Sequence, residues 1–140
     1  MAGLITVAVV LAFATAFGLW RLRADGRLAA AAPDPVTPRL SAAEIGATLG
    51  DRATLVQFSS AFCRPCVATR RTLADVAAMV DGVVHVDIDA ESHLDLVRRL
   101  GVLRTPTVFV LDRDGVVVRR ATGAPRRAAV IAALGQAESG

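Results

Sequence analysis

Two cysteines, Cys63 and Cys66, are the residues of this chain whose types and spacing most clearly suggest chemistry. They are the only cysteines in the 140-residue sequence, and Arg64 and Pro65 separate them. The preceding segment, Thr54–Phe58, is mostly apolar and indicates a strand, while apolar residues recur at helical spacing after Cys66. A Cys-x-x-Cys pair between a strand and a helix is typical of thiol redox chemistry.

The predicted position of Cys63, at the start of a helix, favours the thiolate form of its side chain. Unpaired backbone N–H groups and the positive end of the helix dipole face this position. Arg64 adds a positive charge, and Pro65 suits a first helical turn because its missing N–H would have no partner there. Cys66 lies one turn later, within disulfide reach. We therefore expect Cys63 to attack a substrate disulfide and Cys66 to resolve the mixed disulfide.

Three other roles of the cysteine pair stay open. A structural disulfide between neighbours so close in sequence would restrict the unfolded chain little. A structural zinc needs about four ligands, and besides the two cysteines the chain offers His85 and His93. A pair of merely buried cysteines would leave the strand-to-helix context unused. We expect no metal, and no cofactor beyond a redox-active disulfide between Cys63 and Cys66.

The composition indicates a folded domain and argues against nucleic-acid binding. Apolar residues make up 54% of the chain, the formal net charge is +3, and all 16 basic residues are Arg. From Ser41 onward the numbers of arginines and acidic residues nearly balance, and Phe is the only aromatic residue type. Such a sequence offers no basic patch to follow a phosphate backbone. We expect a monomer that does not bind nucleic acid.

Residues 1–20 are predicted to form a transmembrane anchor. The stretch Ala2–Trp20 is uncharged and almost wholly apolar, and as a helix it would be about 28 Å long, close to the thickness of the hydrocarbon core. A cleaved signal peptide is the alternative, since Ala14-Thr15-Ala16 has the form of a cleavage site. However, no basic residue precedes the apolar run, and the run exceeds the usual length of a signal peptide's apolar region.

The arginines after this span predict the orientation of the chain in a membrane. Arg21, Arg23 and Arg27 follow the apolar run, and only the α-amino group precedes it. The positive-inside rule then places the rest of the chain in the cytoplasm. A single apolar segment can insert in either direction, so the extracytoplasmic orientation stays open.

One domain is predicted over residues 41–136, between a linker over 21–40 and a flexible tail over 137–140. Three prolines in the linker favour an extended tether. The domain's hydrophobic pattern predicts four strands, at Ala53–Phe58, Val83–Ile88 and Val108–Leu111 and from Val116–Val118 until Gly123 breaks the last one. It also predicts a helix from the capping box at Ser41 to Leu49, then helices at Cys63–Val80, from Ser92 to Gly101, and from Pro125 onward. This order indicates an α/β domain with a mixed four-stranded sheet flanked by helices.

These motifs resemble the thioredoxin family. The likeness covers Ser41–Leu134 and rests on Phe-Cys-Arg-Pro-Cys after a strand, Thr105-Pro106-Thr107 about forty residues later, and two glycines, Gly115 and Gly123, behind it. It implies a thioredoxin-like fold in which the peptide bond before Pro106 is cis. It also implies that this loop lies against Cys63, so that the backbone of Thr105 can pair with a bound substrate chain.

The sequence departs from the family pattern at four positions. Phe62 stands where the family usually has Trp, which keeps an apolar wall but removes an indole donor. Gln57 corresponds to the family's buried Asp, which relays protons for the resolving cysteine, and His85 corresponds to the Lys that pairs with it. Since Gln57 cannot titrate, His85 is a candidate proton acceptor if it lies near Cys66, and otherwise it is a His held within the sheet. Arg71 replaces a proline that often kinks the helix, so we expect a straighter helix.

The expected function is that of a membrane-anchored thiol–disulfide oxidoreductase that reduces protein disulfides and takes electrons from a reductase. Arg64 and Pro65, between the cysteines, are expected to tune the reduction potential. The alternative is a binding module, either a thioredoxin-like copper carrier or a cytochrome-biogenesis module. A copper carrier generally needs a third ligand near the thiols, for which His85 is the nearest candidate by topology.

Overall fold

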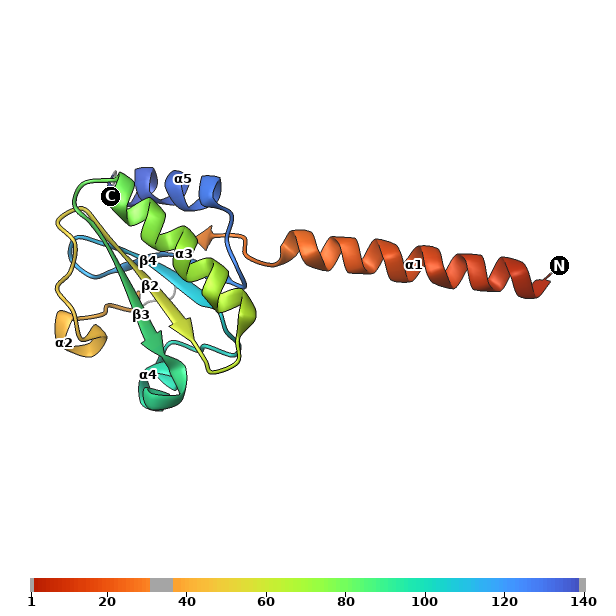
Figure 1. Ribbon diagram of the computed structural model, residues 1–140, viewed down its shortest axis with the longest axis horizontal. Helices are drawn as coiled ribbons and strands as arrows, with labels where there is room; N and C mark the ends of the chain where they lie inside the picture. The colour runs from red at the N-terminus through yellow and green to blue at the C-terminus, as the bar shows by residue number, and fades with distance from the viewer. Residues whose placement is uncertain (1, 31–36, 139–140) are drawn as a thin grey trace.

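The computed structural model describes residues 2–30 and 37–138, which form a long N-terminal helix followed by a layered α/β domain (Figure 1). The helices are α1 (Ala2–Ala24), α2 (Ala42–Ile45), α3 (Arg64–Met79), α4 (Leu94–Arg99) and α5 (Arg127–Ala137), with a 3₁₀ turn, η1 (Ala90–Ser92), before α4. The strands are β1 (Ala29–Ala30), β2 (Ala53–Ser59), β3 (Val83–Asp89), β4 (Thr107–Asp112) and β5 (Val117–Thr122).

The sheet has the order β1-β5-β4-β2-β3. β2 and β3 are parallel and joined through α3, whereas β4 pairs antiparallel with both β2 and β5. The four predicted strands and their mixed pairing are therefore confirmed. The two-residue β1 adds a short fifth strand along the edge of β5. Every residue of β2 is buried, as expected for an apolar strand with neighbours on both sides.

Alternating residues of the strands divide the core between two faces of the sheet. On one face, Leu55, Val108 and Val110 pack with apolar residues of α3 and α5. On the other face, Phe58 and Phe109 meet edge to face, with ring centroids 5.7 Å apart, in a cluster that includes residues of α2 and α4. α3 therefore lies flat on one face of the sheet and carries its first turn to the carboxyl end of β2.

The predicted helix from Ser41 to Leu49 is wrong at its end. The capping box is present, since Ser41 Oγ accepts from the Glu44 N–H and the Glu44 carboxylate accepts from the Ser41 N–H. The helix nevertheless stops after one turn, because Gly46 takes the left-handed conformation with φ of +67°.

The other two short helices also begin later than predicted. Ser92 does not cap α4, because its hydroxyl donates to Asp89, and the side chain of Leu94 is exposed. α5 begins at Arg127 rather than at Pro125. The alanines of α5 are small enough to lie closely on the sheet, so Ala133 and Ala137 are buried while Ile131 faces out.

The predicted linker over 21–40 is partly folded. α1 continues to Ala24, Ala29–Ala30 forms β1, and Leu40 is fully buried in the core. These parts are ordered because β5 offers an unpaired edge and the core accepts an apolar side chain. Residues 31–36, with Pro33 and Pro35, lie outside the described residues.

The predicted tail over 137–140 likewise begins too early. Ala137 ends α5 and is buried, and the carboxylate of Glu138 pairs with Arg52. Residues 139 and 140 lie outside the described residues.

The N-terminal helix is apolar and exposed along its length, apart from Gly18, which is half-buried. Within it, Gly3–Ala24 is long and apolar enough to cross a membrane, with a mean hydropathy of 2.1. A signal sequence near the N-terminus can also be long and apolar enough to meet this criterion. The helix projects from one side of the α/β domain, and its carboxyl end is the end nearest the domain (Figure 1).

Candidate active site

A disulfide joins Cys63 and Cys66 at the start of α3, with their Cα atoms 5.3 Å apart. Cys63 is the N-cap residue of the helix, and Pro65 lies in its first turn. The two sulfurs differ in access, because Cys63 is half-buried whereas Cys66 is only 1% exposed. Of the two, Cys63 is therefore the sulfur that a second protein can reach.

The sulfur of Cys63 lies where the helix start favours negative charge. Its Sγ accepts a hydrogen bond from the backbone N–H of Cys66 over 3.2 Å. An N–H donor of this kind, at the positive end of the helix dipole, stabilises a thiolate when the disulfide is reduced. Arg64 is exposed directly beside Cys63 and adds a positive charge to the same surface.

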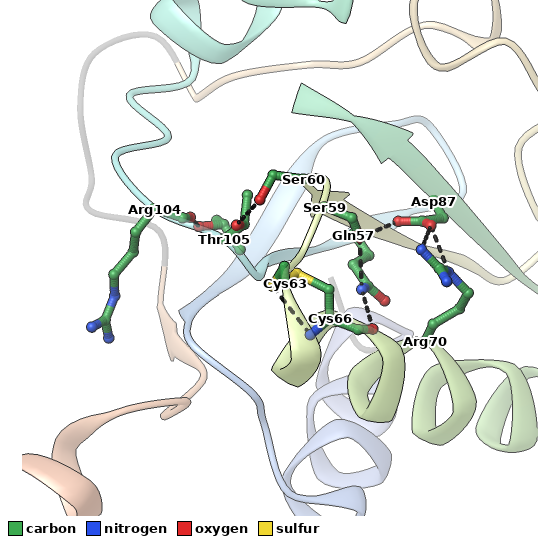
Figure 2. The surroundings of a disulfide bond; sticks show 10 residues. Gln57, Ser59, Ser60, Cys63, Cys66, Arg70, Asp87, Arg104 and Thr105 are labelled. Atoms are coloured by element: carbon green, nitrogen blue, oxygen red, sulfur yellow. Dashed lines mark hydrogen bonds and ion pairs between the residues drawn. A yellow bond between two sulfur atoms is a disulfide. The ribbon is translucent and has the colours of Figure 1, made fainter. Parts of the chain in front are cut away.

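The loop before β4 lies against the cysteine loop, as the family resemblance implies. The Thr105–Pro106 peptide bond is cis, and Pro106 is buried. The hydroxyl oxygens of Thr105 and Ser60 are 2.7 Å apart and share a hydrogen bond that joins the two loops (Figure 2). Ser60, which the sequence analysis did not single out, thus helps to hold Thr105 beside the disulfide.

A shallow cavity of about 410 Å³ opens over the disulfide. Phe62 is fully exposed at its rim with φ of +60°, in the left-handed region that L-residues rarely adopt. Val67 and Arg70, both from α3, complete the rim together with Ser60. Phe62 therefore borders the site as predicted, but its ring points into solvent instead of packing as a wall.

Gln57 is fully buried beneath the disulfide and bonds directly to the backbone of Cys66. Its Nε2 donates to the Cys66 carbonyl oxygen and to Ser59 Oγ, each over 2.9 Å (Figure 2). Its Oε1 has no hydrogen-bond partner among the described residues. The neutral amide thus joins β2 to the first turn of α3, while its own Oε1 stays buried without a donor among the described residues.

The hydrogen-bond network continues from Gln57 to a carboxylate that the sequence analysis missed. Ser59 Oγ donates to Asp87 Oδ1 over 2.5 Å, and the other Asp87 oxygen pairs with Arg70 of α3. Asp87 stands directly opposite Gln57 in the parallel register of β2 and β3. The signal was available in the sequence, because pairing Ala53 with Val83 places these two residues side by side.

His85 lies on the same face of the sheet as Gln57, but the structure does not bring it to the disulfide. Its register partner is Leu55, and the described residues that line the cavity over the disulfide do not include it. Its Nε2 is buried without a partner among the described residues. Burial lowers the pKa of His85 below its ordinary 6.5, and Arg70 lowers it further, while Asp87 acts in the opposite direction.

The described residues offer no third ligand for a metal at the thiols. They contain no group of three or more His, Cys, Asp or Glu side chains placed to hold a metal ion. His93 lies at the start of α4, where its Nδ1 contacts the backbone oxygen of Asp89.

The pKa of His85 predicts how stability depends on pH. Because the folded-state pKa is below the unfolded value of about 6.5, the unfolded chain binds more protons as the pH falls below 6.5. The free energy of unfolding should therefore decrease between pH 7 and pH 5, and His85→Gln should make this decrease shallower. Urea denaturation of the oxidised protein in mild detergent, repeated at several pH values between 5 and 7, measures this free energy.

His93→Gln is the matched control, since the His93 side chain is exposed. This variant should keep the slope of the unmodified protein. An equally steep slope in His85→Gln would show that the buried ring is not its source.

Comparisons with known proteins agree with this geometry. A family model described as a thioredoxin-like domain matches residues 40–138. A thioredoxin of Mycolicibacterium smegmatis is 30% identical over 89 residues, which cover 61% of this chain and 79% of that protein. Among solved structures, chloroplastic thioredoxin z is similar at 30% identity with a TM-score of 0.57, covering 64% of this chain and 81% of that one. Thioredoxin f of spinach chloroplast is similar at 25% identity with a TM-score of 0.54, covering 63% and 78%. The chain belongs to the thioredoxin family.

Proposed function

We propose that this protein is a membrane-anchored thiol–disulfide oxidoreductase that reduces disulfides of other proteins. The observation that carries the proposal is the unequal access of the two sulfurs, with Cys63 reachable at the start of α3 and Cys66 buried behind it. Family membership and the Ser60–Thr105 hydrogen bond, which holds the loop before β4 beside the disulfide, support it.

The reaction begins from the reduced pair. The Cys63 thiolate attacks one sulfur of a substrate disulfide, a mixed disulfide forms, and the other substrate sulfur leaves as a thiolate and takes up a proton. Cys66 then loses its proton and attacks Cys63 Sγ, which releases the second substrate sulfur. Two electrons pass to the substrate, and the Cys63–Cys66 disulfide remains. A separate reductase must return two electrons to this disulfide before the next cycle.

The surroundings of Cys63 define where a substrate chain binds. The backbone of Thr105 is held beside the cysteine loop through Ser60, and an extended substrate segment can pair with it there. Phe62, exposed at the rim of the cavity, offers an apolar surface to the same segment. We assign substrate binding to Phe62, Thr105 and Pro106.

The resolving step depends on how Cys66 loses its proton. Gln57 holds the Cys66 backbone but cannot accept the proton, and His85 is not among the described residues that line the cavity over the disulfide. The carboxylate linked to this region is Asp87, which Ser59 joins to Gln57. Asp87 is paired with Arg70, and the network ends at the backbone oxygen of Cys66 rather than at its sulfur, so the proton of Cys66 passes to solvent in the open cavity.

The apolar helix α1 is the proposed anchor, and the proposed side of the domain is the cytoplasm. Its length and composition support a membrane span, and Arg21, Arg23 and Arg27 at its carboxyl end support the orientation.

A membrane-impermeant thiol reagent should label reduced Cys63 in lysed cells but not in intact cells. Labelling in intact cells would show that the domain lies on the extracytoplasmic side of the membrane. A cytoplasmic reductase could then not supply its electrons.

Reduction of insulin in the presence of dithiothreitol tests the enzyme proposal. The unmodified protein should accelerate insulin precipitation, and Cys63→Ser should reduce the rate to background, because no other sulfur is accessible at the helix start. Arg71→Gln, an exposed change on α3 away from the sulfurs, serves as the control for folding. Insulin reduction above background by Cys63→Ser would contradict the proposal.

Arg64 is proposed to shift the reduction potential. Its charge stabilises the Cys63 thiolate, hence the reduced protein, and so makes the protein a somewhat stronger oxidant. Arg64→Gln should make the potential more negative, on the order of 10 mV for an exposed charge. A glutathione titration measures the potential, and Arg71→Gln should leave it within error. An unchanged or less negative value in Arg64→Gln would contradict the role.

A further inference from the structure

The carboxyl end of α1 is fastened to the loop that carries the cis proline. The Asp25 carboxylate, directly after the helix, accepts from Arg104 Nη2 over 2.6 Å. Arg104 immediately precedes Thr105, and its side chain extends away from the disulfide toward the end of α1 (Figure 2). The ion pair alone is exposed and weak, but it places the helix end next to the substrate-binding loop.

The residues that follow α1 pack tightly on the domain at the same point. Gly26 donates its N–H to the Thr122 oxygen over 2.8 Å, and β1 then pairs with β5. Gly26 has φ of +74°, and a Cβ there would lie 2.0 Å from the backbone oxygen of Ala124. Since only glycine fits, the connection between helix and domain is a close backbone contact rather than a swinging tether.

This contact puts the disulfide at the end of the domain that faces α1. Asp25 holds Arg104, the neighbouring Thr105 bonds to Ser60, and Ser60 borders the cavity over Cys63. The first turns of α3 and α5 both lie on the side of the domain toward α1 (Figure 1). If α1 crosses a bilayer, its direction makes this side the one nearest the headgroups.

The same side carries groups that suit a membrane surface. Arg23, Arg27 and Arg126 line a cavity of about 280 Å³ at the base of α1, where lipid phosphates would meet their charges. Asp25 also lines this cavity, and its carboxylate is paired with Arg104. Phe62 is fully exposed and Leu103 is 94% exposed, on the two loops that flank the disulfide. Basic side chains and exposed aromatic or apolar side chains on one side of a domain are typical of surfaces that lie at the interface.

We propose that the active site faces the bilayer surface and that its substrates are disulfides carried by membrane-bound proteins close to the headgroups. The inference rests on the proposed function and on α1 as the anchor, and it adds the substrate class. Fixing the site near the surface raises the effective concentration of such disulfides at Cys63 relative to disulfides in bulk solution.

Fluorescence quenching tests the placement without using activity. Trp20→Phe removes the chain's one tryptophan, and Phe62→Trp in that background introduces a fluorescent tryptophan at the site. The protein is placed in nanodiscs whose phospholipid headgroups carry a nitroxide quencher. Arg113→Trp in the same background is the control, because the turn between β4 and β5 lies at the other end of the sheet. Quenching should be at least about twofold stronger at position 62, and equal quenching overturns the placement.

Turnover in nanodiscs tests the substrate class. The full-length protein is given three substrates, and the rates of their reduction are compared. They are a lipid-anchored peptide disulfide close to the headgroups, the same disulfide on a spacer of thirty residues, and insulin in solution. The near disulfide should be reduced about fivefold faster than the distant one. Equal rates overturn the substrate class.

Gly26→Ala should abolish this preference, because the added Cβ meets the Ala124 backbone and undocks the helix end. Gly46→Ala is the matched control, since Gly46 also has a positive φ, of +67°, but open space around its Cβ position. Both variants should keep the insulin rate within about twofold, and only Gly26→Ala should lose the near-to-distant ratio. An unchanged ratio in Gly26→Ala contradicts the role of the docked connection. Absence of turnover on all three substrates contradicts the proposed function, while the quenching result still decides the placement.

Discussion

The complete burial of β2 is the constraint on which the rest of the site depends. Its neighbours β3 and β4 pair with it along its length, and helices cover both of its faces. Because the strand cannot shift without exposing its apolar side chains, its carboxyl end fixes where the cysteine loop begins. The cysteines follow the strand by only a few residues, and the cis-proline loop leads directly into β4, so the two halves of the site meet at one edge of the sheet.

A neutral amide at the centre of that edge changes how the cysteine pair is supported. Gln57 gives two hydrogen bonds, one to the backbone of Cys66 and one to Ser59, and so holds the helix start against the sheet. A carboxylate in this place could accept a proton directly, whereas here the nearest linked carboxylate is Asp87, reached through a hydroxyl and already paired with Arg70. Gln57 on β2 therefore positions the helix start, while the carboxylate of this region lies on the neighbouring strand, β3.

Local patterns predicted the strands, α3 and the cysteine pair, because burial and helix initiation depend on residues close together in sequence. Gly46 shows where such patterns fail, since either it or Gly50 could end the helix after Ser41. The site was predictable at Cys63, Cys66 and Pro106. The Ser60–Thr105 and Arg104–Asp25 contacts join residues 45 and 79 positions apart, and such pairings follow from the folded arrangement rather than from spacing. Asp87 was predictable from the parallel register, which pairs it with Gln57, whereas His85, the counterpart of the family's Lys, pairs with Leu55.

In the proposed mechanism Cys63 is the attacking sulfur and Cys66 the resolving one. Trapping the mixed disulfide distinguishes the two roles. Cys66→Ser, incubated with a protein disulfide and analysed by peptide mass spectrometry, should accumulate a covalent complex linked through Cys63, because the sulfur that releases the substrate is missing. Cys63→Ser should accumulate none, since Cys66 is buried. A complex formed through Cys66, in equal or greater yield, would show that Cys63 is not the attacking sulfur.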